Sequence, residues 1–222
     1  LTLSRGYGME SVRQRAMSAA ETVSASLSEV VDDSTLELVV DLRLAFGRLL
    51  AALGANERAE KEHLDTAELS LSQGWTETAC AALALASHAA QARGDRASSG
   101  RAWHQCRDAM ESWPMNRPGE RCGILVDAVG DPLVAVQVLS ALAEVLVDGV
   151  EEDHSRAPII REIISRASEQ ASRCVSPPQG AVESLARVEE RIAPYGRGRG
   201  GRRRPGSTTT ITTDGQAAAG GK

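Results

Sequence analysis

Aromatic residues are scarce in this chain: tryptophan, tyrosine and phenylalanine make up only 3% of its 222 residues. A β-sandwich normally draws on aromatic and β-branched side chains, so this scarcity argues against one. The apolar residues are mostly alanine, leucine and valine, which suit closely packed helices. We therefore expect an all-α fold whose core consists of small aliphatic side chains.

The sequence also lacks signs of a membrane span, a disulfide framework or a metal site. No run approaches the roughly 20 apolar residues that a membrane span needs, and the first residues contain no continuous apolar stretch of the secretory type. The four cysteines are 26, 16 and 52 residues apart, without a Cys-x-x-Cys pair. We expect an intracellular, cytoplasmic protein with reduced cysteines, no metal and no membrane partner.

Motifs of known enzymes are missing as well. The four histidines form no His-Glu-x-x-His set, and the chain has no nucleophile elbow, phosphate loop or dinucleotide fingerprint. The neighbouring carboxylates at 32–33 and 151–153 fall at expected helix ends or loops, where capping and solvation explain them. We expect no catalytic residue, no cofactor and no enzymatic activity.

What the sequence does contain is a succession of helical segments with recognisable ends. Gly54, Gly94 and Gly130 each follow a helical run, where a left-handed C-terminal cap is expected. Asp95 and Asp131 come directly afterwards and are typical N-cap residues. The pattern predicts helices over residues 9–31, 34–53, 56–71, 75–93, 96–112, 120–129, 132–148, 157–174 and 180–193.

A set of small and core residues recurs three times, at spacings of 40 and then 36 residues. Its members are Gly47, Gly54, Ala59, His63 and Thr66; Ser87, Gly94, Ser99, Trp103 and Cys106; Gly123, Gly130, Ala135, Leu139 and Leu142. The set resembles the tetratricopeptide repeat, a helix pair of about 34 residues in which small side chains let two helices cross closely. The resemblance covers about residues 40–148 and implies antiparallel helix pairs stacked as a short solenoid. An irregular helical bundle is the alternative.

The same interpretation divides the chain into four parts. We expect an N-terminal helix in residues 1–33, three helix pairs in 34–149, a C-terminal capping pair in 150–194 and a disordered tail in 195–222. The capping pair lacks the recurring glycines and carries long charged side chains, as the water-facing end of a solenoid requires.

The resemblance implies that the first helix of each pair lines a groove for a peptide or a partner helix. Carried over by matching position or adjacent to a matched one, the polar groove candidates are Asp41, Arg48, His88, Gln91, Arg117, Glu120, Arg121 and Asp127. Because Arg117 and Arg121 are four residues apart, they share one helix face. Together with Arg48 they could clamp a carboxylate or phosphate; ordinary solvated charges are the alternative.

The end of the chain has a different chemistry. Residues 195–222 carry a net charge of +5, whereas the preceding 194 residues carry −10. The segment 196–206 is rich in glycine and arginine and resembles the RGG-type segments of RNA-binding proteins. That resemblance implies nucleic-acid contacts from Arg197, Arg199, Arg202, Arg203 and Arg204. A nuclear-import patch, a contact with the acidic body, and a cloning or translation scar are the alternatives.

Three functions are therefore open. The sequence favours a non-enzymatic interaction module or scaffold that binds a protein or peptide partner through a helical-repeat groove. The second is a nucleic-acid-associated protein, RNA-binding or similar to a viral nucleoprotein or capsid subunit, that uses the basic tail. The third is a fragment of a helical-repeat transcription regulator. Each of these three functions is compatible with a protein that forms a homo-oligomer.

Overall fold

The computed structural model describes residues 35–195 and eight positions between residues 11 and 25, all eight of them helical. The rest of the expected N-terminal helix lies outside the described residues, as does the tail from residue 196 with its five candidate arginines. Every regular element in residues 35–195 is helical, which confirms the expected all-α fold. The elements are α2 (Leu36–Ala52), α3 (Asn56–Ser72), α4 (Thr76–Ala92), α5 (Arg96–Glu111), α6 (Pro118–Val129), α7 (Pro132–Val147), α8 (Arg156–Arg173), α9 (Gln179–Ile192) and the short 3-10 helix η1 (Ala193–Tyr195).

Helices α2, α3, α4 and α5 begin at intervals of 20 residues, and α2, α3 and α4 are each 17 residues long. The three turns between them contain Gly54, Gly74 and Gly94, with φ angles of 76°, 74° and 83°. In each turn the glycine N–H donates to the carbonyl three residues earlier, and the next N–H donates to the carbonyl five residues earlier, at 2.9–3.1 Å. This is a Schellman cap, which needs the left-handed conformation that glycine adopts without strain. The sequence interpretation identified Gly54 and Gly94 and missed the equivalent Gly74.

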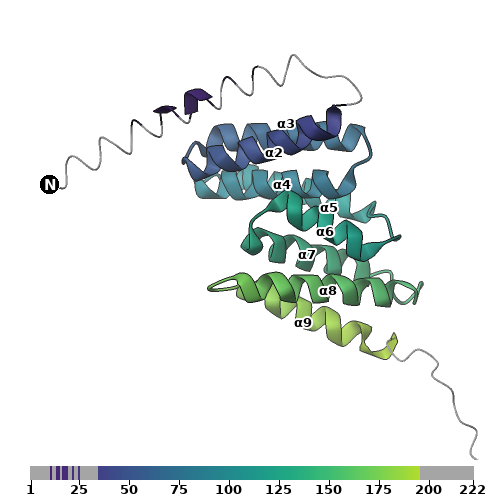
Figure 1. Cartoon of the computed structure of the whole chain (residues 1–222). Helices are drawn as coiled ribbons and strands as arrows, with labels where there is room; N and C mark the ends of the chain where they lie inside the picture. Colours follow the sequence, from purple (N-terminus) through teal and green to yellow (C-terminus); the bar gives the residue numbers. More distant parts are fainter. Residues whose placement is uncertain are drawn as a thin grey trace, which may run out of the picture.

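Helix α4 lies between α2 and α3 on one side and the later helices on the other (Figure 1), and it packs against α3, α5, α6 and α7. Twelve of its 17 residues are buried, and seven of these are alanine. Small side chains on most sides of a helix let several neighbours approach it at once. The main core extends from this helix through α5, α6 and α7 to α8 and α9.

The two expected aspartate caps are confirmed. The Asp95 carboxylate accepts a hydrogen bond from the Ser98 N–H at 3.0 Å, and the Asp131 carboxylate accepts one from the Leu133 N–H at 2.8 Å. Helix α6 begins at Pro118, two residues earlier than the sequence predicts, and Arg117 precedes it with a left-handed φ of 50°.

The regular stacking ends after α5. The first two helix pairs cross closely, and in the second pair the Ser87 hydroxyl donates to the Ser99 carbonyl at 3.0 Å. The third pair differs because α6 has only 12 residues and packs mainly on α4, whereas α7 packs mainly on α8 and α9. A Cβ placed on Gly123 would meet no atom within 4 Å. The third copy of the small-residue set therefore makes no close crossing at this glycine, although the two helices within each of the pairs α2–α3, α4–α5, α6–α7 and α8–α9 remain packed together.

Candidate functional site

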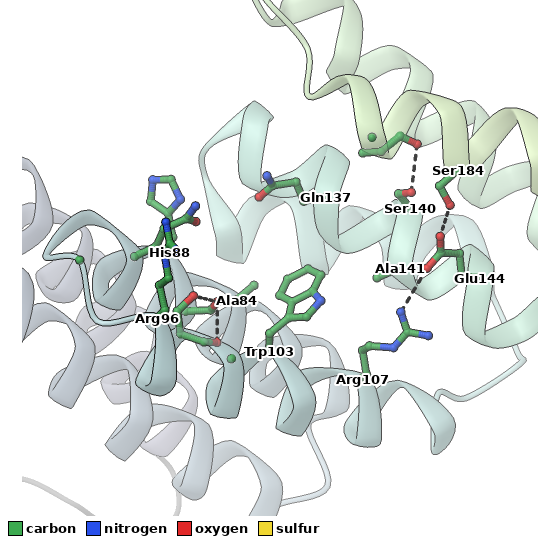
Figure 2. A pocket seen from close by; sticks show the side chains of 17 residues that line it. Ala84, His88, Arg96, Trp103, Arg107, Gln137, Ser140, Ala141, Glu144 and Ser184 are labelled. Carbon is green, nitrogen blue, oxygen red and sulfur yellow. Dashed lines mark hydrogen bonds and ion pairs between the residues drawn. The ribbon is translucent and has the colours of Figure 1, made fainter.

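A cleft of about 820 Å³ opens between α4 and α5 on one side and α7 and α9 on the other (Figure 2). We call it the α5–α7 cleft. The cleft is open because the residues that line it are small, whereas larger side chains would fill the space between the helices. These small residues are Ala84, Gly94, Gly100, Ala141, Gly180 and Ala181. A Cβ placed on Gly100 or Gly180 would meet nothing within 4 Å, so the space beside both glycines is open.

One end of the cleft is fixed by a bonded polar cluster. The Glu144 carboxylate on α7 accepts a hydrogen bond from the Arg107 guanidinium on α5 at 3.1 Å, and another from the Ser184 hydroxyl on α9. Nearby, the Ser140 hydroxyl donates to the Ala181 carbonyl at 3.1 Å. These bonds join α5, α7 and α9 and set the width of the cleft at this end.

The other end carries polar side chains without such partners. His88 and Gln91 at the end of α4 and Arg96 at the start of α5 are all exposed. Within the described part of the chain, none of these three side chains makes a hydrogen bond or ion pair with another residue. Trp103 is half-buried and lies between the two ends (Figure 2). The cleft thus offers an aromatic surface flanked by hydrogen-bonding groups.

A second, smaller cavity of about 530 Å³ lies between α2, α6 and the start of α4. Asp41, Arg48 and Asp127 line it, together with Trp75. The Arg48 guanidinium donates to the Ala128 carbonyl at 3.0 Å and to the Asp127 carbonyl at 3.3 Å. It therefore caps the C-terminal end of α6, where the last carbonyls of a helix have no partner within the helix.

The three arginines considered as an anion clamp are placed apart. Arg117 lies at the start of α6, exposed, and pairs with Glu120 at 3.4 Å. Arg121 forms an ion pair with the buried Glu77 and donates to the Asn116 carbonyl at 2.9 Å. Arg48 caps the far end of the same helix, so the three side chains do not converge on one ligand position.

The polar groove candidates therefore fall into three groups. His88 and Gln91 line the α5–α7 cleft, and Asp41, Arg48 and Asp127 line the smaller cavity, while Arg117, Glu120 and Arg121 line neither. The sequence interpretation did not select Trp103 or Arg107 as groove residues because it looked for groove residues only on first helices. Trp103 could have been noticed as the one Trp, Tyr or Phe side chain in α5.

Buried titratable groups do not point to catalysis. Hydrogen bonding with Cys80, followed by burial, holds the pKa of the Cys106 thiol well above its ordinary value. Burial is also the main reason that the pKa of Cys122 rises to about 12. Thiols in this state are protonated and are poor nucleophiles at neutral pH. In residues 35–195 and the eight earlier positions, no group of three or more histidine, cysteine or acidic side chains could hold a metal ion.

Comparison with protein-family models, curated proteins and solved structures gave no match to this chain. None of the helices described in the structure is long and apolar enough to cross a membrane.

Proposed function

We propose that the protein is a non-enzymatic interaction module that binds a peptide segment of a partner in the α5–α7 cleft. The observation that carries this proposal is the open cleft itself, with small residues along its walls and polar side chains without partners at one end. Ligand sites are concave, with largely apolar walls and a few placed polar groups. The resemblance to tetratricopeptide repeats supports the same choice, because His88 and Gln91 occupy groove positions by that resemblance and line the cleft.

Each part of the cleft suits a different part of a peptide. Trp103 offers a rigid aromatic face for an apolar side chain, and such residues contribute strongly to binding. The side-chain amides of Gln91 and Gln137 can each donate to and accept from a peptide backbone. Glu144 already accepts from Arg107 and Ser184, so it shapes the far end of the cleft.

The serines of the cleft support a binding role over a catalytic one. The hydroxyls of Ser87, Ser140 and Ser184 are engaged with the Ser99 carbonyl, the Ala181 carbonyl and Glu144. Among the described residues, none of these hydroxyls is hydrogen-bonded to a histidine. A serine nucleophile is normally activated by such a neighbouring base.

Filling the cleft tests the proposal. We expect Gly100→Leu to place a side chain in the cleft without a clash, because a Cβ at this position meets nothing within 4 Å. Leucine is also a better helix former than glycine, by a little less than the roughly 0.8–1 kcal/mol that separates alanine from glycine, so the fold should be retained. Random dodecapeptides displayed on phage would be selected on the immobilised full-length protein. The selected peptides should bind Gly100→Leu at least about tenfold more weakly.

Gly123→Leu is the matched control, because Gly123 also lies inside a helix beside open space but does not line the cleft. It should bind the selected peptides as the wild type does. Equal binding by wild type and Gly100→Leu would place the peptide site elsewhere, and a selection that retains no peptide would contradict peptide binding.

A second candidate function, RNA binding by residues 196–222, is favoured by composition. This segment contains five arginines interspersed with glycine, whereas residues 35–195 contain 24 acidic and 16 basic residues. Arginines on a pliable chain can contact phosphates and stack on bases. No observation on the described residues favours the third expectation, a fragment of a transcription regulator.

Truncation tests the RNA-binding candidate. We expect the full chain, but not residues 1–195, to bind a labelled single-stranded RNA of mixed sequence in fluorescence anisotropy. If all five arginines contact phosphates, the logarithm of the affinity should fall with the logarithm of salt with a slope of about −3.5. Equal binding by the truncated chain, or an affinity independent of salt, would reject this function.

A further inference from the structure

The α5–α7 cleft differs in charge from the rest of the described molecule. Acidic residues outnumber basic ones by 24 to 16 in residues 35–195. The residues lining the cleft reverse this balance, because they include Arg96, Arg107 and His88 but only one carboxylate, Glu144. A surface whose sign opposes that of its surroundings selects ligands of the complementary charge.

The one carboxylate in the cleft is already compensated. Glu144 accepts from the Arg107 guanidinium at 3.1 Å and from the Ser184 hydroxyl, so its negative charge is offset within the protein. The Arg96 guanidinium, in contrast, has no partner among the described residues and is exposed at the opposite end. His88 lines the same cleft. The uncompensated charge of the cleft is therefore the positive charge of Arg96.

One helix N-terminus adds to this positive character. Helix α9 begins at Gln179, and its start borders the cleft through Gly180. The start of α5 also borders the cleft, but there the Asp95 carboxylate offsets the partial charge. The N-terminal end of a helix carries a partial positive charge from its unpaired N–H groups. No side chain caps the start of α9, because Pro178 occupies the N-cap position without a side-chain hydrogen bond.

Resting on the function proposed above, we infer that the α5–α7 cleft recognises acidic peptide segments. An aspartate or glutamate of the ligand pairs with Arg96, and an apolar residue of the ligand packs on Trp103. The amides of Gln91 and Gln137 hydrogen-bond the ligand backbone. The arginine-rich segment 196–206 of this chain is positively charged, whereas the expected ligand is negatively charged. This segment is therefore not the occupant of the cleft.

The amino-acid composition of the bound peptides tests this assignment. The dodecapeptides selected on the full-length protein would be sequenced, and aspartate plus glutamate should exceed lysine plus arginine. Arg96→Gln should weaken binding of the acidic peptides about fivefold to tenfold at low salt, because a charge-assisted hydrogen bond is lost. Arg187→Gln is the matched control: it removes the same charge from an exposed position on α9 outside the cleft, and should leave the affinity unchanged.

The outcomes separate the ligand class from the function. If the selected peptides are neutral or basic, or if Arg96→Gln and Arg187→Gln weaken binding equally, the acidic preference is wrong. In that case, blocking by Gly100→Leu would still support peptide binding in the cleft. If the wild type retains no peptide, or if Gly100→Leu binds like the wild type, the proposed function fails together with the inference. Thermal melting of Arg96→Gln near the wild-type temperature confirms that a lower affinity comes from the lost charge.

Discussion

Gly47→Ala is expected to lower the free energy of unfolding by about 2 kcal/mol, although alanine is the better helix former. A Cβ at position 47 would lie 2.7 Å from both ring nitrogens of His63. His63 is only 1% exposed and is held between α2 and α3, so its ring has little room to move. Strain from the close contact should outweigh the gain in helix propensity. Denaturant unfolding followed by circular dichroism measures the change.

The same substitution at Gly123 is the control, because a Cβ there meets no atom within 4 Å. Gly123→Ala should raise the stability by up to about 1 kcal/mol through helix propensity alone. The double variant Gly47→Ala/His63→Ala should lose less stability than the two single variants combined, because removing the ring removes the clash. If Gly47→Ala stabilises the protein as Gly123→Ala does, the ring of His63 does not pack closely against position 47.

The second large effect is the loss of stability in mild acid caused by His63. Burial, and then the charge of Arg48, lower the pKa of His63 from 6.5 to about 4. The buried His63 Nδ1 makes no hydrogen bond to any described residue that would favour the charged ring. The unfolded chain binds a proton on His63 more readily than the folded protein does. The contribution of neutral His63 to the free energy of unfolding is therefore fully present above pH 6.5 and is lost as the pH falls towards 4. It amounts to about 3 kcal/mol.

The pH effect is measured by denaturant unfolding of the wild type and His63→Gln between pH 7 and pH 4. The wild type should lose stability in this window more steeply than the variant. Burial raises the pKa of Glu62, which acts in the opposite direction, but that contribution is common to both proteins and cancels in the difference. His104→Gln removes an exposed histidine as a control. Equal slopes for wild type and His63→Gln would show that His63 is not buried as a neutral ring.

Helix ends could be predicted from the sequence because they depend on local chemistry. Asp95 and Asp131 cap the helices that follow them, and Gly54, Gly94 and Gly130 have the positive φ expected of a C-terminal cap. A glycine after a helix and an aspartate before one act through their own backbone neighbours. Such signals remain readable without knowledge of the tertiary packing.

The candidate site was less predictable because it depends on how distant helices cross. Arg48 contacts the carbonyls of α6, 79 and 80 residues further along the chain, and nothing near Arg48 in the sequence indicates that partner. The third copy of the small-residue set looks like the first two, yet the short α6 places Gly123 beside open space. The cleft follows from that shift, because α7 turns towards α8 and α9 and leaves a gap beside α5.

The position of α4 has a consequence for how the molecule unfolds. In a simple solenoid each repeat touches only its neighbours, so the ends can fray while the middle stays folded. Here α4 packs against α3, α5, α6 and α7, and alanines fill most of those contacts. Separating α4 from one neighbour therefore weakens its contacts with the others. Helices α3 to α7 should therefore unfold together as one cooperative block. Local unfolding should be confined to the helices outside this block, α2 at one end and α8 and α9 at the other.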